Sequence, residues 1–187
     1  MMHSDNWALK AKQMGYRSRA VFKLEEILNK TRTKKFKNVL DLGSSPGAWS
    51  QFILKKNSNA NVYALDILDM EPIVGVSFFK QSIEQIYNVP QILKLKGNFN
   101  LVISDIAPNL SGIKSVDNEN ILDLNKLTVE IAFDYLCNGG TLIMKTFQNS
   151  FLKTLRKDME LSFKIVQTYK PAASKKQSGE IYLYGVK

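Results

Sequence analysis

The stretch that decides the fold runs Asp41-Leu42-Gly43-Ser44-Ser45-Pro46-Gly47-Ala48-Trp49-Ser50-Gln51, directly after the apolar pair Val39-Leu40. It predicts a buried strand that ends in a tight, glycine-punctuated turn, and the turn opens a helix. In an open α/β sheet, ligands bind at the carboxyl ends of the strands. Gly43 and Gly47 let the backbone approach a ligand closely, because glycine has no Cβ. The stretch therefore predicts a small-molecule site near the N-terminus.

Two phosphate-binding patterns are absent from this turn. A dinucleotide fingerprint needs G-x-G-x-x-G, and here the second glycine comes too late. A P-loop needs a lysine directly after its last glycine, whereas Ala48 follows Gly47. The ligand is therefore not expected to be gripped by a pyrophosphate. From the glycines alone, an ordinary strand-to-helix turn is an equally good interpretation.

Length and composition indicate one domain over residues 1–187, with 44% hydrophobic and 23% charged residues. The single cysteine, Cys137, excludes an internal disulfide and suits a reducing compartment. The single histidine, His3, argues against a zinc site and against a Ser-His-Asp hydrolase. No apolar run approaches the roughly 20 residues of a membrane span, and the N-terminus lacks the apolar core of a signal peptide. We therefore expect an unsecreted protein without a metal.

The net charge of +9 predicts an anionic partner, RNA or DNA above all. Basic residues interleave with Trp7 and Tyr16 in the N-terminal region, residues 1–30, as suits phosphates and stacked bases. The candidate RNA contacts there are Lys10, Lys12, Arg17 and Arg19. Further basic clusters are Lys34, Lys35 and Lys37, then Lys153, Arg156 and Lys157, then Lys175 and Lys176. The alternative is a solvated basic surface without a nucleic-acid partner.

Short apolar strands alternate with helices along the chain. Strands are predicted over residues 38–42, 62–67, 76–80, 99–106, 141–147, 163–169 and 181–186, and helices over 18–29, 47–56, 118–136 and 150–161, with a weaker helix broken near Pro90. Asn138-Gly139-Gly140 is interpreted as the stop of the long helix. Repeated βα units predict an α/β fold with a mostly parallel, doubly wound sheet. The last two strands lack a helix between them and are expected to pair antiparallel.

Three acids, Asp41, Asp66 and Asp105, stand at the carboxyl ends of predicted strands. Those ends converge on one crevice in this architecture, and an acid about 20 residues past the glycine turn is the usual acceptor for ribose hydroxyls. Asp66 therefore suggests a nucleoside-bearing ligand. Each acid alone is better explained as a helix N-cap or turn residue. The three together favour a ligand site.

Lys145 lies among apolar residues in the predicted strand over 141–147. Lysine is rarely buried without a partner, so its side chain either snorkels to water or is held in the crevice. The second interpretation predicts an amine beside Asp105 whose basicity is tuned for proton transfer.

Five segments together resemble the FtsJ/RrmJ-like family of RNA ribose 2′-O-methyltransferases, which use S-adenosylmethionine (SAM). They are residues 16–27, 41–51, 104–112, 144–147 and 179–183, in that order and across nearly the whole chain. The resemblance implies a Rossmann-like class I SAM-dependent fold whose last strand is antiparallel. It implies a cofactor site formed by Asp41, Gly43, Ser44, Ser45, Pro46, Gly47, Trp49, Asp66 and Asp105.

The family's Lys-Asp-Lys-Glu tetrad corresponds to Lys23, Asp105, Lys145 and Glu180. Only the resemblance assigns roles to Lys23 and Glu180. The sequence pattern by itself predicts that Lys23 lies on a solvated helix face and that Glu180 is a charge on an edge strand. In the implied mechanism, neutral Lys145 takes the proton of the ribose 2′-hydroxyl. A nearby Lys23 charge favours that neutral form and Asp105 opposes it. Lys23 is also expected to orient the RNA.

One position departs from the family. Its members often carry an acid after the third strand that reads the adenine amino group, and Ser82 stands there. Weaker adenine recognition, or recognition by the backbone, is expected.

The stretch Asp105-Ile106-Ala107-Pro108-Asn109 resembles the ribosomal RNA branch, which methylates a uridine of the large-subunit RNA. The tRNA anticodon-loop branch tends to have Asp-Gly-Ala-Pro-Asp there and is the first alternative. A non-enzymatic RNA-binding assembly factor with a vestigial SAM site is the second, and a NAD-dependent oxidoreductase is the third. We expect a monomer acting on ribosomal RNA or a ribosomal particle, in mitochondria or cytoplasm.

Overall fold

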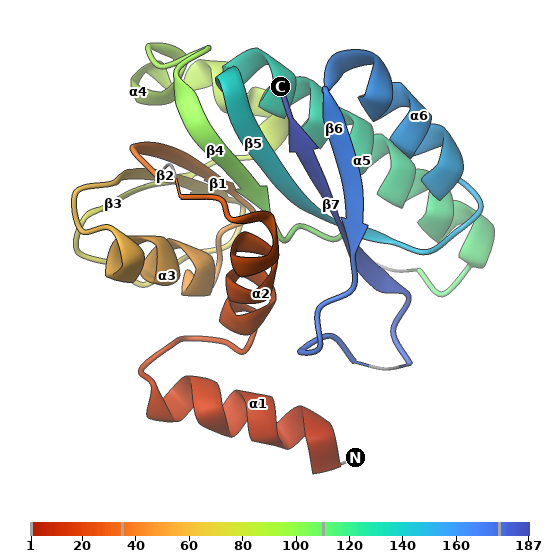
Figure 1. Ribbon diagram of the computed structural model, residues 1–187, viewed down its shortest axis with the longest axis horizontal. Helices are drawn as coiled ribbons and strands as arrows, with labels where there is room; N and C mark the ends of the chain where they lie inside the picture. Colours follow the sequence, from red (N-terminus) through yellow and green to blue (C-terminus); the bar gives the residue numbers. More distant parts are fainter. Residues whose placement is uncertain (1, 35, 110, 176) are drawn as a thin grey trace.

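The computed structural model describes residues 2–34, 36–109, 111–175 and 177–187, so Lys35 and Lys176 lie outside it. The elements along the chain are α1 (Met2–Gln13), α2 (Val21–Thr31), β1 (Asn38–Leu42), α3 (Ala48–Lys56), β2 (Asn61–Asp66), β3 (Val76–Lys80), η1 (Ile83–Asn88), α4 (Pro90–Leu93), β4 (Phe99–Ser104), α5 (Lys114–Tyr135), β5 (Leu136–Phe147), α6 (Leu152–Ser162), β6 (Ile165–Tyr169) and β7 (Glu180–Val186). Helices and strands alternate along the chain as predicted (Figure 1).

The described residues form a seven-stranded sheet in the order β3-β2-β1-β4-β5-β7-β6. The pairs from β3 to β5 are parallel, and β7 runs antiparallel to both β5 and β6. The predicted doubly wound sheet and its antiparallel last strand are therefore confirmed. The strand order reverses between β1 and β4, and such a switch point is where α/β sheets bind ligands.

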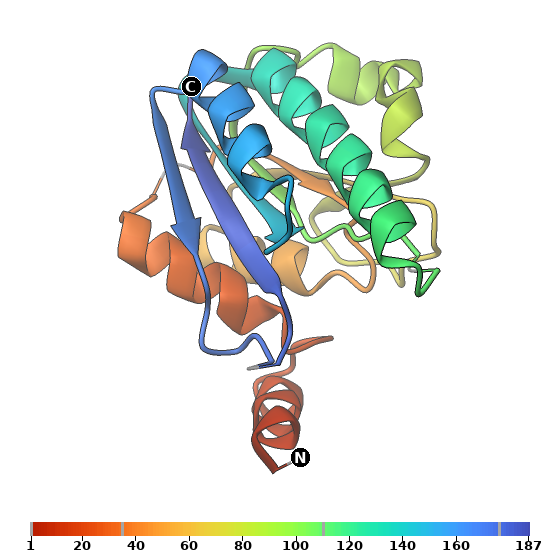
Figure 2. The ribbon, with the colours of Figure 1, turned by 90° about the vertical axis from the view of Figure 1, so that its right-hand side faces the viewer.

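Helices cover both faces of the sheet, because the central strands are apolar on both sides. Leu101 and Ile103 of β4 join the core beneath α2 and α3. Val102, between them, faces the opposite core, to which α5 and α6 contribute. Figures 1 and 2 show the sheet between these two helical layers.

Helix α1 stands below the sandwich and joins it through α2 (Figure 2). Ala11 is buried, and the Trp7 ring packs 5.0 Å from that of Phe22 in α2. The Nζ of Lys10 lies 5.0 Å from the centre of the same Phe22 ring, within the range of a cation–π contact. Helix α1 is thus held against α2 by an apolar contact.

The interpretation of Asn138-Gly139-Gly140 as a helix stop is wrong. Helix α5 ends at Tyr135, and β5 begins with the next residue. The glycines lie within β5 at an irregularity, where the register with β4 shifts between Phe99 and Leu101. Main-chain hydrogen bonds from Gly139 to the Lys187 carbonyl (2.9 Å) and from Lys187 to the Gly140 carbonyl (3.0 Å) hold this bulge. The glycines therefore allow a bulge rather than end a helix.

In the part of the chain that is described, no helix has the length and apolarity needed to cross a bilayer.

We predict that Gly140→Ala destabilises the fold. A Cβ there would lie 2.8 Å from the carbonyl oxygen of Cys137 and 3.0 Å from that of Phe99. Backbone oxygens cannot move aside like a flexible side chain, so a loss of about 1–3 kcal/mol in the free energy of unfolding is expected. Urea denaturation measures it. Gly179→Ala is the control, since its nearest contact would be 3.7 Å, and an equal loss in both variants would contradict the prediction.

Candidate active site

A cavity of about 870 Å³ opens at the carboxyl edge of the sheet, at the switch point. Its wall includes Gly43 and Ser45 from the turn after β1, Asp66 from the end of β2, and Asp105 from the loop after β4. Two of the three predicted crevice acids therefore lie where the sequence placed them. The far wall is formed by α5, through Asp123 and Leu124 among others.

Asp41, the third acid, does not line the cavity. It is 1% exposed, and its carboxylate accepts a hydrogen bond of 2.7 Å from the hydroxyl of Ser50 in α3. Burial raises the pKa of Asp41 to about 7, although the Ser50 hydrogen bond opposes the shift. Its hydrogen bond joins β1 to α3, the two elements that flank the glycine loop.

The glycine loop needs Gly43 for two reasons. Its φ of 70° lies in the left-handed region, and a Cβ would stand 2.0 Å from Cγ1 of Ile106. Gly47 precedes α3 with a φ of 104°. The loop is held to β2 through Asp66, whose Oδ2 accepts a 2.8 Å hydrogen bond from the Ser45 main-chain N–H. The other carboxylate oxygen of Asp66 accepts one of 2.8 Å from the N–H of Leu68.

The remaining predicted cofactor residues lie behind this wall. Ser44 is buried, and its hydroxyl has no hydrogen-bond partner among the residues described. The Pro46 carbonyl accepts a hydrogen bond from Arg17. Trp49 is 3% exposed, and its indole N–H donates to the carbonyl of Ala20 at 2.8 Å. None of these three residues lines the cavity.

The cavity wall also includes Ser82 and Glu84, at the place where the family pattern has an acid. The Ser82 hydroxyl accepts from the Glu84 main-chain N–H at 3.4 Å, which caps η1, and contacts the Glu84 carboxylate at 3.1 Å. An acidic group is thus present on this wall two residues later than the family pattern would put it. The sequence pattern did not single out Glu84, because an exposed glutamate in a short helix carries no signal.

Lys145 and Asp105 form the first of two ion pairs beside the cavity. The Lys145 Nζ lies 3.3 Å from Asp105 Oδ1 and also donates to the Asp105 main-chain carbonyl. The lysine comes from β5 and the acid from the loop after the neighbouring strand β4, so parallel pairing brings them together. The Lys145 side chain is only 11% exposed, which agrees with the interpretation of an amine held in the crevice.

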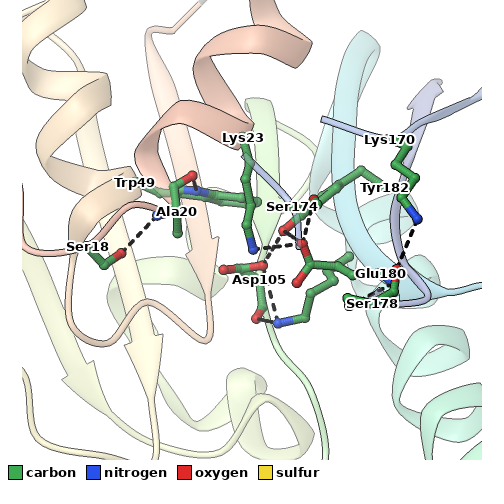
Figure 3. Close-up of polar contacts among 11 residues, drawn as sticks. Ser18, Ala20, Lys23, Trp49, Asp105, Lys170, Ser174, Ser178, Glu180 and Tyr182 are labelled. Atoms are coloured by element: carbon green, nitrogen blue, oxygen red, sulfur yellow. Dashed lines mark hydrogen bonds and ion pairs between the residues drawn. The ribbon is translucent and has the colours of Figure 1, made fainter. Parts of the chain in front are cut away.

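Lys23 and Glu180 form the second pair, with Nζ and Oε1 2.8 Å apart (Figure 3). The expectation of a solvated helix face for Lys23 is wrong, since its side chain is 8% exposed where α2 packs on the sheet. Glu180 is not an edge-strand charge either, because it begins β7, which lies between β5 and β6. Burial raises the pKa of Glu180, but the hydrogen bond and charge of Lys23 outweigh this and lower it.

Tyr182 joins the two pairs and was missed by the sequence analysis. Its hydroxyl donates to Asp105 Oδ1 at 2.7 Å and lies 3.4 Å from Glu180 Oε1 (Figure 3). Burial, together with these carboxylates, raises the pKa of the Tyr182 phenol well above its usual value. The hydroxyl therefore stays protonated and acts as a hydrogen-bond donor to Asp105. Ser174 adds a donor to the same Glu180 oxygen at 2.8 Å.

The predicted RNA contacts fall into three groups. Lys10 and Lys12 are exposed on α1, and Arg19 is half-buried before α2. Lys23 belongs to the ion pair with Glu180. Arg17 points toward the loops around the cavity, where its guanidinium donates to main-chain carbonyls.

The sheet order, the cavity at the switch point and the antiparallel β7 define a class I methyltransferase fold. The profile of the FtsJ-like methyltransferase family matches residues 16–187. The chain belongs to the FtsJ-like methyltransferase family. The predicted family and fold are thereby confirmed, and the chain is a methyltransferase rather than a nicotinamide-dependent oxidoreductase.

Proteins similar to this chain are named as ribosomal RNA methyltransferases. Ribosomal RNA large subunit methyltransferase E of Stenotrophomonas maltophilia is 38% identical over 186 residues, covering 97% of this chain and 89% of the relative. The protein of that name from Dichelobacter nodosus is 40% identical over 186 residues, with the same coverages. A crystal structure of a ribosomal RNA methyltransferase from Plasmodium falciparum matches with a TM-score of 0.80 and 33% identity, over 91% of this chain and 97% of that one.

We predict that the buried Asp41 makes stability depend on pH. The pKa of Asp41 is raised in the folded protein, so between about pH 4 and 7 the folded state holds this proton and the unfolded state does not. The free energy of unfolding therefore falls as the pH rises through this window. The shift from 3.8 to about 7 is about three pKa units, which corresponds to at most ~4 kcal/mol. Asp41→Asn cannot ionise, so its free energy of unfolding should lack this decline.

Urea denaturation of wild type and Asp41→Asn at several pH values tests this. The difference between the two proteins should move in favour of the variant as the pH rises. Asp158→Asn, at an exposed carboxylate of α6, is the matched control. Parallel pH curves for wild type and Asp41→Asn would contradict the prediction.

Proposed function

We propose that this chain transfers a methyl group from SAM to a ribose 2′-hydroxyl of large-subunit ribosomal RNA, as a single domain over residues 1–187. The observation that carries the proposal is the arrangement of two lysine–carboxylate pairs beside the cavity. Lys145 pairs with Asp105 at 3.3 Å and Lys23 with Glu180 at 2.8 Å. The relatives named as large-subunit methyltransferases support the ribosomal substrate.

The cavity fits SAM in size and charge. A volume of about 870 Å³ accommodates a nucleoside with an amino-acid tail. Gly43 leaves the space that a Cβ would fill, and carboxylates line the wall at Asp66, Glu84, Asp105 and Asp123. They suit a ligand with a cationic sulfur and an ammonium group. Asp66 would accept from the ribose hydroxyls, since both its oxygens retain free lone pairs after accepting one hydrogen bond each. When bound, SAM supplies a methyl group on a positively charged sulfur.

Lys145 is the candidate base. In its neutral form it accepts the proton of the ribose 2′-hydroxyl as that oxygen becomes the nucleophile. The ammonium that results is stabilised by Asp105, whose carboxylate and main-chain carbonyl both contact the Lys145 nitrogen. Asp105 also lines the cavity, so it connects the base to the cofactor site.

Lys23, Glu180 and Tyr182 orient the base and the substrate. The Lys23 ammonium is fixed by Glu180 and lies 5.7 Å from the centre of the Tyr182 ring. Tyr182 in turn holds Asp105 through its hydroxyl at 2.7 Å. A displacement of any of these groups would misalign Lys145, and small displacements cost large factors in rate.

RNA binds through the basic N-terminal region in this proposal. Lys10 and Lys12 present exposed ammonium groups on α1, and Trp7 lies beside Lys10. Arg19, half-buried before α2, lies between these lysines and Lys23 in the sequence, and Lys23 belongs to the ion pair with Glu180. Because phosphate contacts release counterions, RNA affinity should fall steeply with salt. A monomer that acts inside the cell, on RNA or on a ribosomal particle, is consistent with these features.

We predict that Lys145→Ala abolishes methyl transfer while leaving SAM binding within about twofold, because the amine serves proton transfer, which contributes 10²–10⁴-fold. The measurement is transfer of labelled methyl from SAM to total RNA, ribosomal subunits and tRNA. Lys145→Met keeps the length of the buried side chain without the amine. Lys94→Ala, at an exposed lysine of the segment after α4, is the matched control.

Alkali-stable label in large-subunit RNA, absent with both Lys145 variants, is the expected result. Label in tRNA would keep the chemistry and overturn the choice of substrate. An active Lys145→Ala protein would overturn the role of the base. SAM binding without transfer to any RNA would favour the assembly factor.

A further inference from the structure

The segment between α1 and α2 is fastened to the outside of the cofactor cavity by Arg17. Its Nη1 donates to the carbonyls of Pro46 (3.0 Å) and Glu71 (2.6 Å), and its Nη2 donates to the carbonyl of Pro72 (2.9 Å). All three acceptors are main-chain oxygens. The guanidinium is therefore bound to the backbone of two loops.

Neighbouring contacts fix the same segment. The Arg17 main-chain N–H donates to Gln51 Oε1 of α3 at 3.0 Å. The Lys55 ammonium donates to the Met14 carbonyl at 2.9 Å, and the Trp49 indole to the Ala20 carbonyl at 2.8 Å. The segment thus lies against α3 on both sides of Arg17, and its guanidinium has a defined position.

The two loops that Arg17 joins form neighbouring parts of the cavity wall. Pro46 belongs to the glycine loop, whose Ser45 lines the cavity. Glu71 and Pro72 belong to the loop between β2 and β3, whose Ile67 and Leu68 line it as well. Between the loops, the Ser45 hydroxyl donates to the Asp69 carbonyl at 3.2 Å.

The Arg17 guanidinium is closely surrounded by neighbouring atoms. A Cβ on Gly47 would lie 3.2 Å from Arg17 Nη1 and 2.6 Å from Cδ1 of Ile73. Gly47, the Ile73 side chain and the Arg17 guanidinium are therefore in close contact.

We propose that Arg17 is a positioning residue that holds together the two loops of the SAM cavity wall, and not an RNA contact. This inference rests on the proposed function, because it names SAM as the ligand. A planar guanidinium with five fixed donors can bridge three carbonyls at once, whereas a lysine is a single point charge on a flexible stem. An RNA phosphate would have to compete with carbonyls that already hold these donors.

The contacts of Arg17 also connect the candidate RNA-binding helix α1 to the cofactor cavity. Lys10 and Lys12 lie on α1, which the segment around Arg17 connects to the glycine loop. The RNA-binding surface is thereby held at a defined place relative to the cavity.

Arg17→Lys and Arg17→Gln test the inference. Calorimetry measures the binding of S-adenosylhomocysteine, and fluorescence anisotropy measures the binding of a labelled fragment of large-subunit ribosomal RNA at two salt concentrations. Steady-state kinetics separate the KM for SAM from kcat. Both variants should bind S-adenosylhomocysteine about tenfold more weakly or worse, because several hydrogen bonds to a charged group are lost. Their KM for SAM should rise more than kcat falls, and RNA affinity should stay within about twofold.

Two controls separate positioning from charge and from stability. Lys12→Ala removes an exposed charge on α1 and should weaken RNA without changing S-adenosylhomocysteine affinity. Lys187→Met removes a cation that also donates to main-chain carbonyls, of Phe133 and Leu136, at a distance from the cavity. It should lower Tm without changing cofactor affinity.

Unchanged cofactor affinity in Arg17→Lys with weakened RNA binding would overturn the inference and restore Arg17 as an RNA contact. A second result would also overturn the inference. Arg17→Lys would weaken cofactor and RNA binding to the same degree, and Lys187→Met would do the same at an equal loss of Tm, so the effect would be one of stability. If wild type itself fails to bind S-adenosylhomocysteine, the proposed function fails, and that result is distinct from either outcome for Arg17.

Discussion

The site depends on the need of two nearly buried ammonium groups for carboxylate partners. An unpaired charge at this depth would cost several kcal/mol, so the fold must deliver an acid to each lysine. Lys23 forms an ion pair with Glu180 of β7, and Lys145 forms one with Asp105 of the loop after β4. The Lys23–Glu180 pair ties α2 to β7, and the Tyr182 hydroxyl links this pair to the pair of Lys145 and Asp105.

The cofactor side of the site is organised by backbone rather than by charge. Gly43 permits a close approach to Ile106, Asp66 holds the glycine loop to β2, and Arg17 holds it to the loop before β3. The charged pairs and the loop cavity meet at Asp105, which belongs to both. A single carboxylate thus relates the position of the base to that of the methyl donor.

Much of the fold was predictable because local patterns and tertiary packing agree. The strands over 38–42 and 76–80 have the predicted bounds, because short apolar stretches between polar turns favour strands. The prediction that Gly139 and Gly140 end a helix is wrong, although two glycines after a helical pattern usually mark its end. Whether they end a helix or form a bulge depends on pairing with β4 and on the contact with Lys187, neither of which is local.

The sequence by itself determined the alternation of elements, the ligand edge of the sheet, and the candidacy of Asp66, Asp105 and Lys145, because these follow from apolar periodicity and from where strands end. The tertiary structure decided which charges are buried and what each one touches. Lys23 looks solvated in its helix, and Arg17 looks like one more basic residue of an RNA-binding arm. Only packing against β7 and against the cavity loops distinguishes them, since burial and hydrogen bonding are properties of neighbours distant in sequence.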